Sequence, residues 1–284
     1  MIENFVLVSS QQEALTKYNL KAQEFCFPIP SPSVLSGGDF AWVITSKTPD
    51  TLQSMKFGFT SEVSEKRMDL LNLRTDESER EDEEDEYDRL MRICLGLTYS
   101  ASFHSCRCAV LVDGFLVSSP DNTTYLIHMQ NKERPFALAG IYANWFNKET
   151  KHYETGFLVI TTAANPMLRR IGVDTMPVIL LPKNVIIWLD LKQERRAYLP
   201  LIHTFPDDQM NGYPVSGNIF LGNLRNNMLQ PIGQRFKPEL VHPVKPKAPP
   251  TIEKYTMPVI RSYGKRKERG DSTTPWFENR RKVE

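Results

Sequence analysis

Cysteine is scarce in this chain of 284 residues, which contains only Cys26, Cys94, Cys106 and Cys108. So few cysteines in so long a chain argue against a disulfide-stabilised scaffold and indicate a reducing compartment, so we predict a cytoplasmic protein. Cys106 and Cys108 form one C-x-C pair without a second pair or a histidine cluster, which is a poor zinc signature. We therefore predict no metal site and no cofactor.

Long hydrophobic runs are also missing. The most apolar segments, such as MPVILLP at 176–182, are far shorter than the roughly 20 residues that a membrane-spanning helix needs. The N-terminal sequence MIENFVLVSSQQE has no basic region, and its apolar stretch is too short for a signal peptide. The sequence therefore predicts a soluble protein that does not associate with membranes.

An excess of charge of one sign is the third absence. Lysine and arginine number 35, aspartate and glutamate 34, and the formal net charge is +1. No overall basic field would attract nucleic acid, so any such attraction must be local. The hydrophobic content of 40% is ordinary for a globular protein, and the length allows a well-buried core.

Short strands and helices are predicted along most of the chain. Alternating and apolar runs predict strands at 40–44, 57–59, 108–112, 125–129, 136–142 and 157–161. Short helices are predicted at 14–18, after the capping-box residues Ser10 and Glu13; at 167–170, between Asn165-Pro166 and Gly172; and at 185–191, after Pro182. This pattern is typical of one β-rich α+β domain with small peripheral helices.

Two segments differ from the rest in composition. Residues 75–88, TDESEREDEEDEYD, are strongly acidic, and we favour a solvated loop leading into a helix at 90–95 over an acidic docking site. Residues 236–284 form a basic, proline-rich tail that we predict to be extended or partly disordered, outside a domain of residues 1–235. Its basic clusters fit either phosphate contacts or a solubilising terminus.

An Asp-Gly step between two apolar runs marks a turn. Residues 108–112 and 115–117 flank Asp113 and Gly114, which predicts a reversal or a kink within a sheet. Turns at sheet edges often carry catalytic groups. Here the residues that follow, including Val117, have no group that titrates near neutral pH.

Seven short segments follow one another in a recognisable order. They are MIENFVL (1–7), FGF (57–59), LNLRTDE (71–77), RCAVLVDGF (107–115), FALAGIYANW (136–145), TTAANP (161–166) and MPVIL (176–180). In this order and at this spacing, over roughly residues 1–230, they resemble the motifs of the SOS response-associated peptidase (SRAP) family of abasic-site processing proteins. The resemblance implies a β-rich α+β fold with a mainly antiparallel, barrel-like core.

The resemblance also implies a reaction centre, which this chain has largely lost. In the family a cysteine at position two becomes the N-terminus, and its amine and thiol capture the aldehyde of an abasic site in single-stranded DNA. A glutamate and a histidine move protons, and an asparagine positions the terminal residue. The matching positions here hold Ile2, Val117, Val173 and Asn72, of which only Asn72 is retained.

The DNA-binding positions of the family are partly kept. Asn4 stands where the family has an arginine and Phe57 where it has a tryptophan, while Arg74 and Arg107 are retained. Phe57 or Trp42 would then stack on a base. An ion pair of Arg74 with the acidic segment, and packing of Phe57 in the core, remain equal alternatives.

Three functions remain open at this point. The first is a non-catalytic relative that binds single-stranded or abasic DNA, and the second is a scaffold that contacts a protein through the acidic segment or the tail. The third is a surviving enzyme that uses the amine of Met1. Cys108 is expected to be a buried apolar residue, and His104 and His128 are expected to be structural. If the resemblance holds, the positions of Ile2, Asn72, Val117 and Val173 lie around one pocket.

Overall fold

The computed structural model describes residues 3–24, 26, 28–61, 68–75, 100–131, 133–147, 151–220, 229 and 232. These residues belong to one compact unit, residues 1–246. Ile2, nearly all of the acidic segment, the helix predicted at 90–95 and the tail at 236–284 lie outside the described residues, as does the predicted boundary after residue 235.

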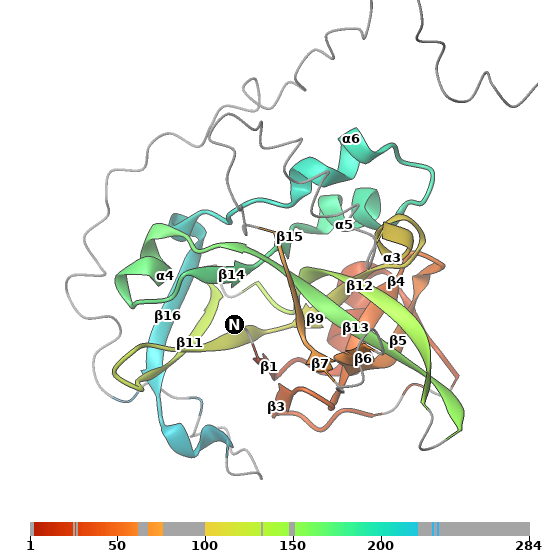
Figure 1. The fold of residues 1–284 in the computed structure, drawn as a ribbon. Coiled ribbons are helices and arrows are strands. Elements are labelled where there is room, and N and C mark those ends of the chain that lie inside the picture. Colours follow the sequence, from red (N-terminus) through yellow and green to blue (C-terminus); the bar gives the residue numbers. More distant parts are fainter. Residues whose placement is uncertain are drawn as a thin grey trace, which may run out of the picture. The chain divides into compact units, whose positions relative to one another are not determined.

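A closed ring of five strands forms the centre of the fold (Figure 1). The strands are β4 (Phe40–Thr45), β5 (Thr48–Phe57), β9 (Arg107–Val112), β12 (Phe136–Asn147) and β13 (His152–Ala163). β4 pairs with β5 and β9, β12 pairs with β9 and β13, and β13 returns to β5. Only the last pairing is parallel. The predicted fold class, β-rich with a mainly antiparallel and barrel-like core, is thereby confirmed.

Short strands extend this barrel sheet at its margins. β8 (Asn72–Arg74) runs parallel to β13, β2 (Lys21–Ala22) runs parallel to β5, β14 (Thr175–Pro177) pairs with β13, and β15 (Ile179–Leu180) pairs with β12. A separate two-stranded ladder joins β6 (Phe59–Ser61) to β7 (Met68–Leu70).

A second sheet lies beside the barrel, and its strands β11 and β16 are at the left of Figure 1. Its order is β16 (Met210–Val215), β11 (Thr124–Met129), β10 (Gly114–Ser118), β1 (Asn4–Leu7) and β3 (Ser33–Ser36), and all its pairings are antiparallel. Because side chains alternate along a strand, each strand contributes to both faces. Phe5 and Leu7 join the main core on the inner face, whereas Val6 joins a smaller cluster on the outer face.

All described α-helices are short, as predicted. They are α1 (Gln11–Tyr18), α3 (Ser100–Ser105), α4 (Pro166–Arg170), α5 (Pro182–Leu189) and α6 (Arg195–Tyr198), and 3-10 turns cover Leu199–Leu201, Asp207–Gln209 and Gly217–Phe220. The capping box at Ser10 and Glu13 is formed, and Asn165 accepts the Leu168 N–H. Gly172 has a φ of 81°, which suits the predicted stop after α4.

Asp113 marks a bend between the two sheets. β9 belongs to the barrel and β10 to the second sheet, so the chain passes from one to the other instead of forming a hairpin. The Asp113 carboxylate accepts hydrogen bonds from Val8 N (2.5 Å), Ser9 N (2.6 Å) and Ser9 Oγ (2.6 Å). The kink that we predicted is thus present, and its aspartate anchors the segment between β1 and α1.

Replacement of Asp113 by alanine is expected to lower the free energy of unfolding by about 2–4 kcal/mol, because two backbone N–H groups of the β1–α1 segment lose their acceptor. Asp113→Asn keeps one carbonyl oxygen and should cost less. Urea denaturation followed by tryptophan fluorescence measures both changes. Asp208→Ala, at an exposed carboxylate, is the control, and an equal effect of Asp113→Ala and this control would contradict the anchoring role.

Candidate functional site

Val117, which the resemblance aligns with the glutamate of the family, lies in the main hydrophobic core. The residue sits on β10 opposite Tyr125, with its side chain 4% exposed. It shares the inner face of the second sheet with Phe115, two residues earlier, as strand alternation requires. An apolar side chain packed in this way can neither donate nor accept a proton.

Val173, which the resemblance aligns with the histidine of the family, follows α4 and is half-buried against the same core. Its backbone N–H donates to Leu168 O at 3.0 Å, which fixes the turn after the helix. Thr175, two residues further on, is buried on β14 opposite Ala163. Neither position offers an ionisable group.

Asn72 and Arg74 project from β8 along the edge of β13. Asn72 lies opposite Val159 and Arg74 opposite Thr161. Leu73, between them, points into the main core, whereas Arg74 is exposed. The Asn72 amide oxygen is buried. This retained asparagine is therefore held at the carboxyl end of β13.

Asn72, Val117 and Val173, three of the four positions that the resemblance assigns to the reaction centre, lie on segments that adjoin one another. Asn72 pairs with the end of β13, and Ala164, just beyond this strand, donates its N–H to Asp174 O at 2.8 Å, next to Val173. Gly172 packs so closely on Pro120 that an added Cβ would lie 2.5 Å from the proline ring. Pro120 follows Val117 by three residues. Neither of the two pockets described below is lined by Asn72, Val117 or Val173.

Phe57 and Trp42 are core residues, and the expectation that either ring stacks on a base is corrected. Phe57 is 1% exposed and stacks on Phe157, with ring centroids 5.2 Å apart, and its centroid lies 4.8 Å from that of Phe5. Trp42 is 2% exposed. Neither ring presents a face on which a nucleobase could lie.

Arg107 is also internal, which corrects its assignment to DNA. Its guanidinium donates to Trp188 O (2.5 Å), Phe103 O (3.0 Å), His104 O (3.0 Å) and Asp190 O (3.0 Å). Its centre lies 4.0 Å from the centroid of the Tyr198 ring. Burial lowers the pKa of Arg107, and the four carbonyl groups stabilise its charge in the interior. The arginine therefore joins α3, α5 and α6 to the barrel.

Asn4 and the other singled-out residues have structural contacts. The Asn4 amide oxygen accepts a hydrogen bond from Ser36 Oγ at 2.7 Å, across the β1–β3 pair. Cys108 is fully buried, as expected, and burial raises the pKa of its thiol. His104 contacts the guanidinium of Arg195, and burial lowers the pKa of its imidazole.

Three exposed arginines lie on β8 and α4, the two elements that adjoin the carboxyl-terminal part of β13. β13 leads directly into α4, whose last turn carries the exposed Arg169 and Arg170, and Arg74 is exposed at the end of β8. Asp174 contributes one exposed carboxylate nearby. Arg169 and Arg170 were not among the predicted site residues, although two adjacent arginines in the last turn of a capped helix are a usable signal.

A separate apolar groove of about 760 Å³ runs along α5. Ile186 is 73% exposed there and Leu191 44% exposed. Lys183 and Lys192 stand at the two ends of the helix segment on its rim. The Asp190 carboxylate at the same rim already accepts hydrogen bonds from Lys192 N and Gln193 Nε2, both at 2.9 Å.

Comparison with known proteins identifies the family. The family model described as SOS response associated peptidase (SRAP) matches residues 3–220, so the chain belongs to the SRAP family. No curated protein matches it in sequence.

Solved structures share the fold. A protein from Bacteroides thetaiotaomicron has a TM-score of 0.61 and 19% identity, with 81% of this chain and 99% of that chain covered. A protein from Bordetella bronchiseptica has a TM-score of 0.57 and 14% identity, with 75% and 99% covered. A phage-related protein from the same organism has a TM-score of 0.55 and 16% identity, with 75% and 93% covered.

Two predicted absences can be examined in the described part of the chain. Within it no helix is long and apolar enough to cross a membrane. Among the same residues no group of three or more histidine, cysteine or acidic side chains is placed to hold a metal ion. The three cysteines that the structure describes, Cys26, Cys106 and Cys108, are free thiols.

Proposed function

We propose that this SRAP protein is non-catalytic and binds single-stranded or abasic DNA at the carboxyl end of β13. The observation that carries the proposal is a buried valine close in the fold to exposed arginines. Val117 is packed in the core where an acid would be needed, while Arg74, Arg169 and Arg170 are exposed beside the same segments. Exposed guanidinium groups bind the phosphates of a single strand, and the neutral chain as a whole does not repel it.

The loss of catalysis follows from the residue types. Capture of an aldehyde as a stable ring needs an amine and a thiol on one residue, and Ile2 has no thiol. Each proton-transferring group contributes about 10²–10⁴-fold in rate, and valine stands at both positions. The amine of a retained Met1 could form a Schiff base, which water hydrolyses, so residual activity is the least supported function.

Borohydride trapping tests this part of the proposal. The protein is incubated with abasic single-stranded DNA, with and without borohydride, beside an SRAP protein that has cysteine at position two. The control protein should give an adduct without reductant, and this chain none. A permanent crosslink formed by the unmodified chain would overturn the non-catalytic assignment, and an adduct seen only with borohydride would indicate a transient Schiff base.

Substitution of the three arginines by glutamine should weaken DNA binding. The slope of log affinity against log salt concentration should become shallower by about 2 in the triple variant Arg74→Gln, Arg169→Gln, Arg170→Gln. Each phosphate contact of a single strand contributes about 0.7 to this slope. Fluorescence anisotropy with a labelled oligonucleotide measures the slope. The matched control is Lys183→Gln, Lys192→Gln, Arg196→Gln, which removes three exposed cations elsewhere. Equal effects of the two triple variants, or no binding at low salt, would refute the interface.

A protein-interaction role is the second candidate, and the groove along α5 favours it. Its exposed Ile186 and Leu191 suit an apolar anchor, and Lys183 and Lys192 suit flanking acidic residues, so the occupant is an acidic peptide with aliphatic or aromatic anchors. A labelled peptide of this type should bind and lose affinity on Ile186→Asp. Tyr153→Asp, at a side chain 78% exposed on β13, is the control. If a peptide whose acidic residues are replaced by lysine binds as tightly as the acidic peptide, recognition of charge is excluded.

The cytoplasmic location and the roles of the acidic segment and the basic tail are also part of the proposal. Free thiols at the three described cysteines are compatible with a reducing cytoplasm. Contacts of the acidic segment or of the basic tail with DNA or protein stay predictions, because those residues lie outside the described part of the chain.

A further inference from the structure

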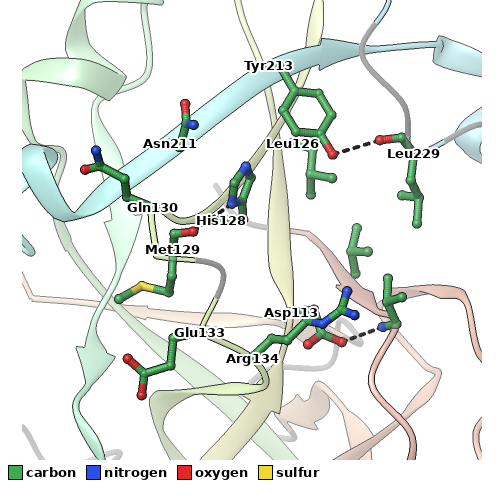
Figure 2. A pocket seen from close by; sticks show the side chains of 12 residues that line it. Asp113, Leu126, His128, Met129, Gln130, Glu133, Arg134, Asn211, Tyr213 and Leu229 are labelled. Atoms are coloured by element: carbon green, nitrogen blue, oxygen red, sulfur yellow. Dashed lines mark hydrogen bonds between the residues drawn. The ribbon is translucent and has the colours of Figure 1, made fainter. Parts of the chain in front are cut away.

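A pocket of about 810 Å³ opens on the outer face of the second sheet (Figure 2). Its walls come from β1, β11 and β16 and from the loop that precedes β12. It is therefore separate from the basic surface at the end of β13, which belongs to β8 and α4. The volume lies in the range of small-molecule sites.

Strand register arranges the pocket from an apolar end to a polar end. Leu126 lies opposite Tyr213, and His128, two residues further along β11, lies opposite Asn211. Leu126 belongs to the outer hydrophobic cluster with Val6, and the Tyr213 hydroxyl donates to Leu229 O at 2.8 Å. Figure 2 shows Gln130 and Asn211 on the side of the pocket away from Leu229. A ligand with an apolar, flat body and a hydrogen-bonding edge fits this gradient.

The acidic groups of the pocket are already engaged by protein partners. Asp113 accepts three hydrogen bonds from Val8 and Ser9. Glu133 forms an ion pair with Lys17, at 3.1 Å, and accepts a hydrogen bond from Asn131 Nδ2. These contacts lower the pKa of Glu133 and keep it ionised and engaged.

Arg134 supplies a positive charge at the opening of the pocket. It is exposed at the pocket rim and forms no ion pair with any described residue. The pocket thus favours a ligand whose polar end is anionic.

We propose that this pocket binds a nucleoside monophosphate. Tyr213 and Leu126 contact the base, the side-chain amides of Gln130 and Asn211 hydrogen-bond its edge, and Arg134 binds the phosphate. The Asn211 oxygen accepts the Gly212 N–H at 2.9 Å, so its amide nitrogen is the group that donates to the base. Amides pair well with base edges, and guanidinium groups pair well with phosphates.

Isothermal titration calorimetry with 5′-dAMP and 5′-dTMP tests the proposal. Saturable binding with a dissociation constant of about 1 mM or below is expected for at least one of them. Deoxyadenosine, which lacks the phosphate, should bind about tenfold to a hundredfold more weakly, as should inorganic phosphate, which lacks the base. Weak binding of all four probes, or equal binding of phosphate and nucleotide, would overturn the assignment.

Variants separate this pocket from the proposed DNA surface. Arg134→Gln should reduce nucleotide affinity to that of the nucleoside, and Asn211→Leu should weaken both. Arg196→Gln is the control for removal of an exposed arginine. The triple glutamine variant of Arg74, Arg169 and Arg170 should bind 5′-dAMP as the unmodified chain does. Wild-type affinity in Arg134→Gln would refute the phosphate contact, whether or not the oligonucleotide binds.

Discussion

Arg107→Met is expected to lower the free energy of unfolding by about 3–5 kcal/mol, because four backbone carbonyl groups lose their donor inside the protein. The guanidinium also leaves the face of the Tyr198 ring, 4.0 Å away. Methionine fills much of the volume, so the loss reports mainly on polar contacts. The midpoint of urea unfolding, with an unchanged dependence on urea concentration, measures the effect.

Two further variants define what Arg107 contributes. Arg107→Lys keeps the charge but cannot donate in four directions, so it should also destabilise the protein. Arg196→Met, at a side chain that is 46% exposed and forms an ion pair with the exposed Glu194, should change stability by less than about 0.5 kcal/mol. A loss below about 1 kcal/mol for Arg107→Met would show that the buried arginine is dispensable. It would then be available for a role outside the core.

Val117→Glu is expected to destabilise the fold strongly at pH 8 and less at pH 5. Burial at a site that is 4% exposed raises the pKa of a carboxyl group. The native state would then keep a proton that the unfolded state loses above about pH 4.3, so stability falls as pH rises from there through the raised folded-state pKa. Thermal unfolding at several pH values measures this slope.

Matched variants separate charge from polarity at this position. Val117→Gln introduces a polar side chain without a titrating group, so its cost should not depend on pH in this range. Ser118→Glu places the same carboxyl on the exposed neighbouring residue and should be nearly neutral. If Val117→Glu matches Val117→Gln at pH 8, the site is open to water, and an acid there could resume proton transfer.

Local patterns predicted much of the barrel. The runs at 108–112 and 125–129 agree with β9 and β11 to within one residue, and the cap at Asn165 and the stop at Gly172 are correct. These elements were readable because their apolar side chains and capping groups are local signals. β12 and β13 extend well beyond the predicted runs, since they pair with each other as far as Asn147 and His152. Such extensions depend on the partner strand.

Strands with polar or irregular sequences were missed. Most residues of β5, TPDTLQSMKF, are exposed or only partly buried. The segment forms a strand because β4 and β13 pair with it. β16, MNGYPV, contains Gly212 and Pro214, which argue against a strand in the sequence but are tolerated at the edge of the sheet.

In the candidate site, too, local motifs were predictable and contacts between distant residues were not. Family motifs located Asn72, Val117 and Val173 on adjoining segments, and one pocket shared with Ile2, which lies outside the described residues, stays a prediction. Of the two alternatives left open for Phe57, core packing is the one observed, and Arg107 is buried where DNA contact was expected, because burial arises from contacts distant in sequence. Phe57 meets Phe157, and Arg107 meets Asp190. No local pattern distinguishes a buried arginine from one that faces a phosphate.

The ring of five strands closes through an unusually short seam. β5 and β13 share only two residue pairs, at Lys56–Gly156 and Phe57–Phe157, where β12 and β13 share eight. The barrel therefore has its fewest backbone pairings between β5 and β13, and we expect local opening of the sheet to begin there. Amide hydrogens at this seam should exchange with deuterium well before those of the long hairpin, and slow exchange would mean that the stacked phenylalanine rings hold it shut.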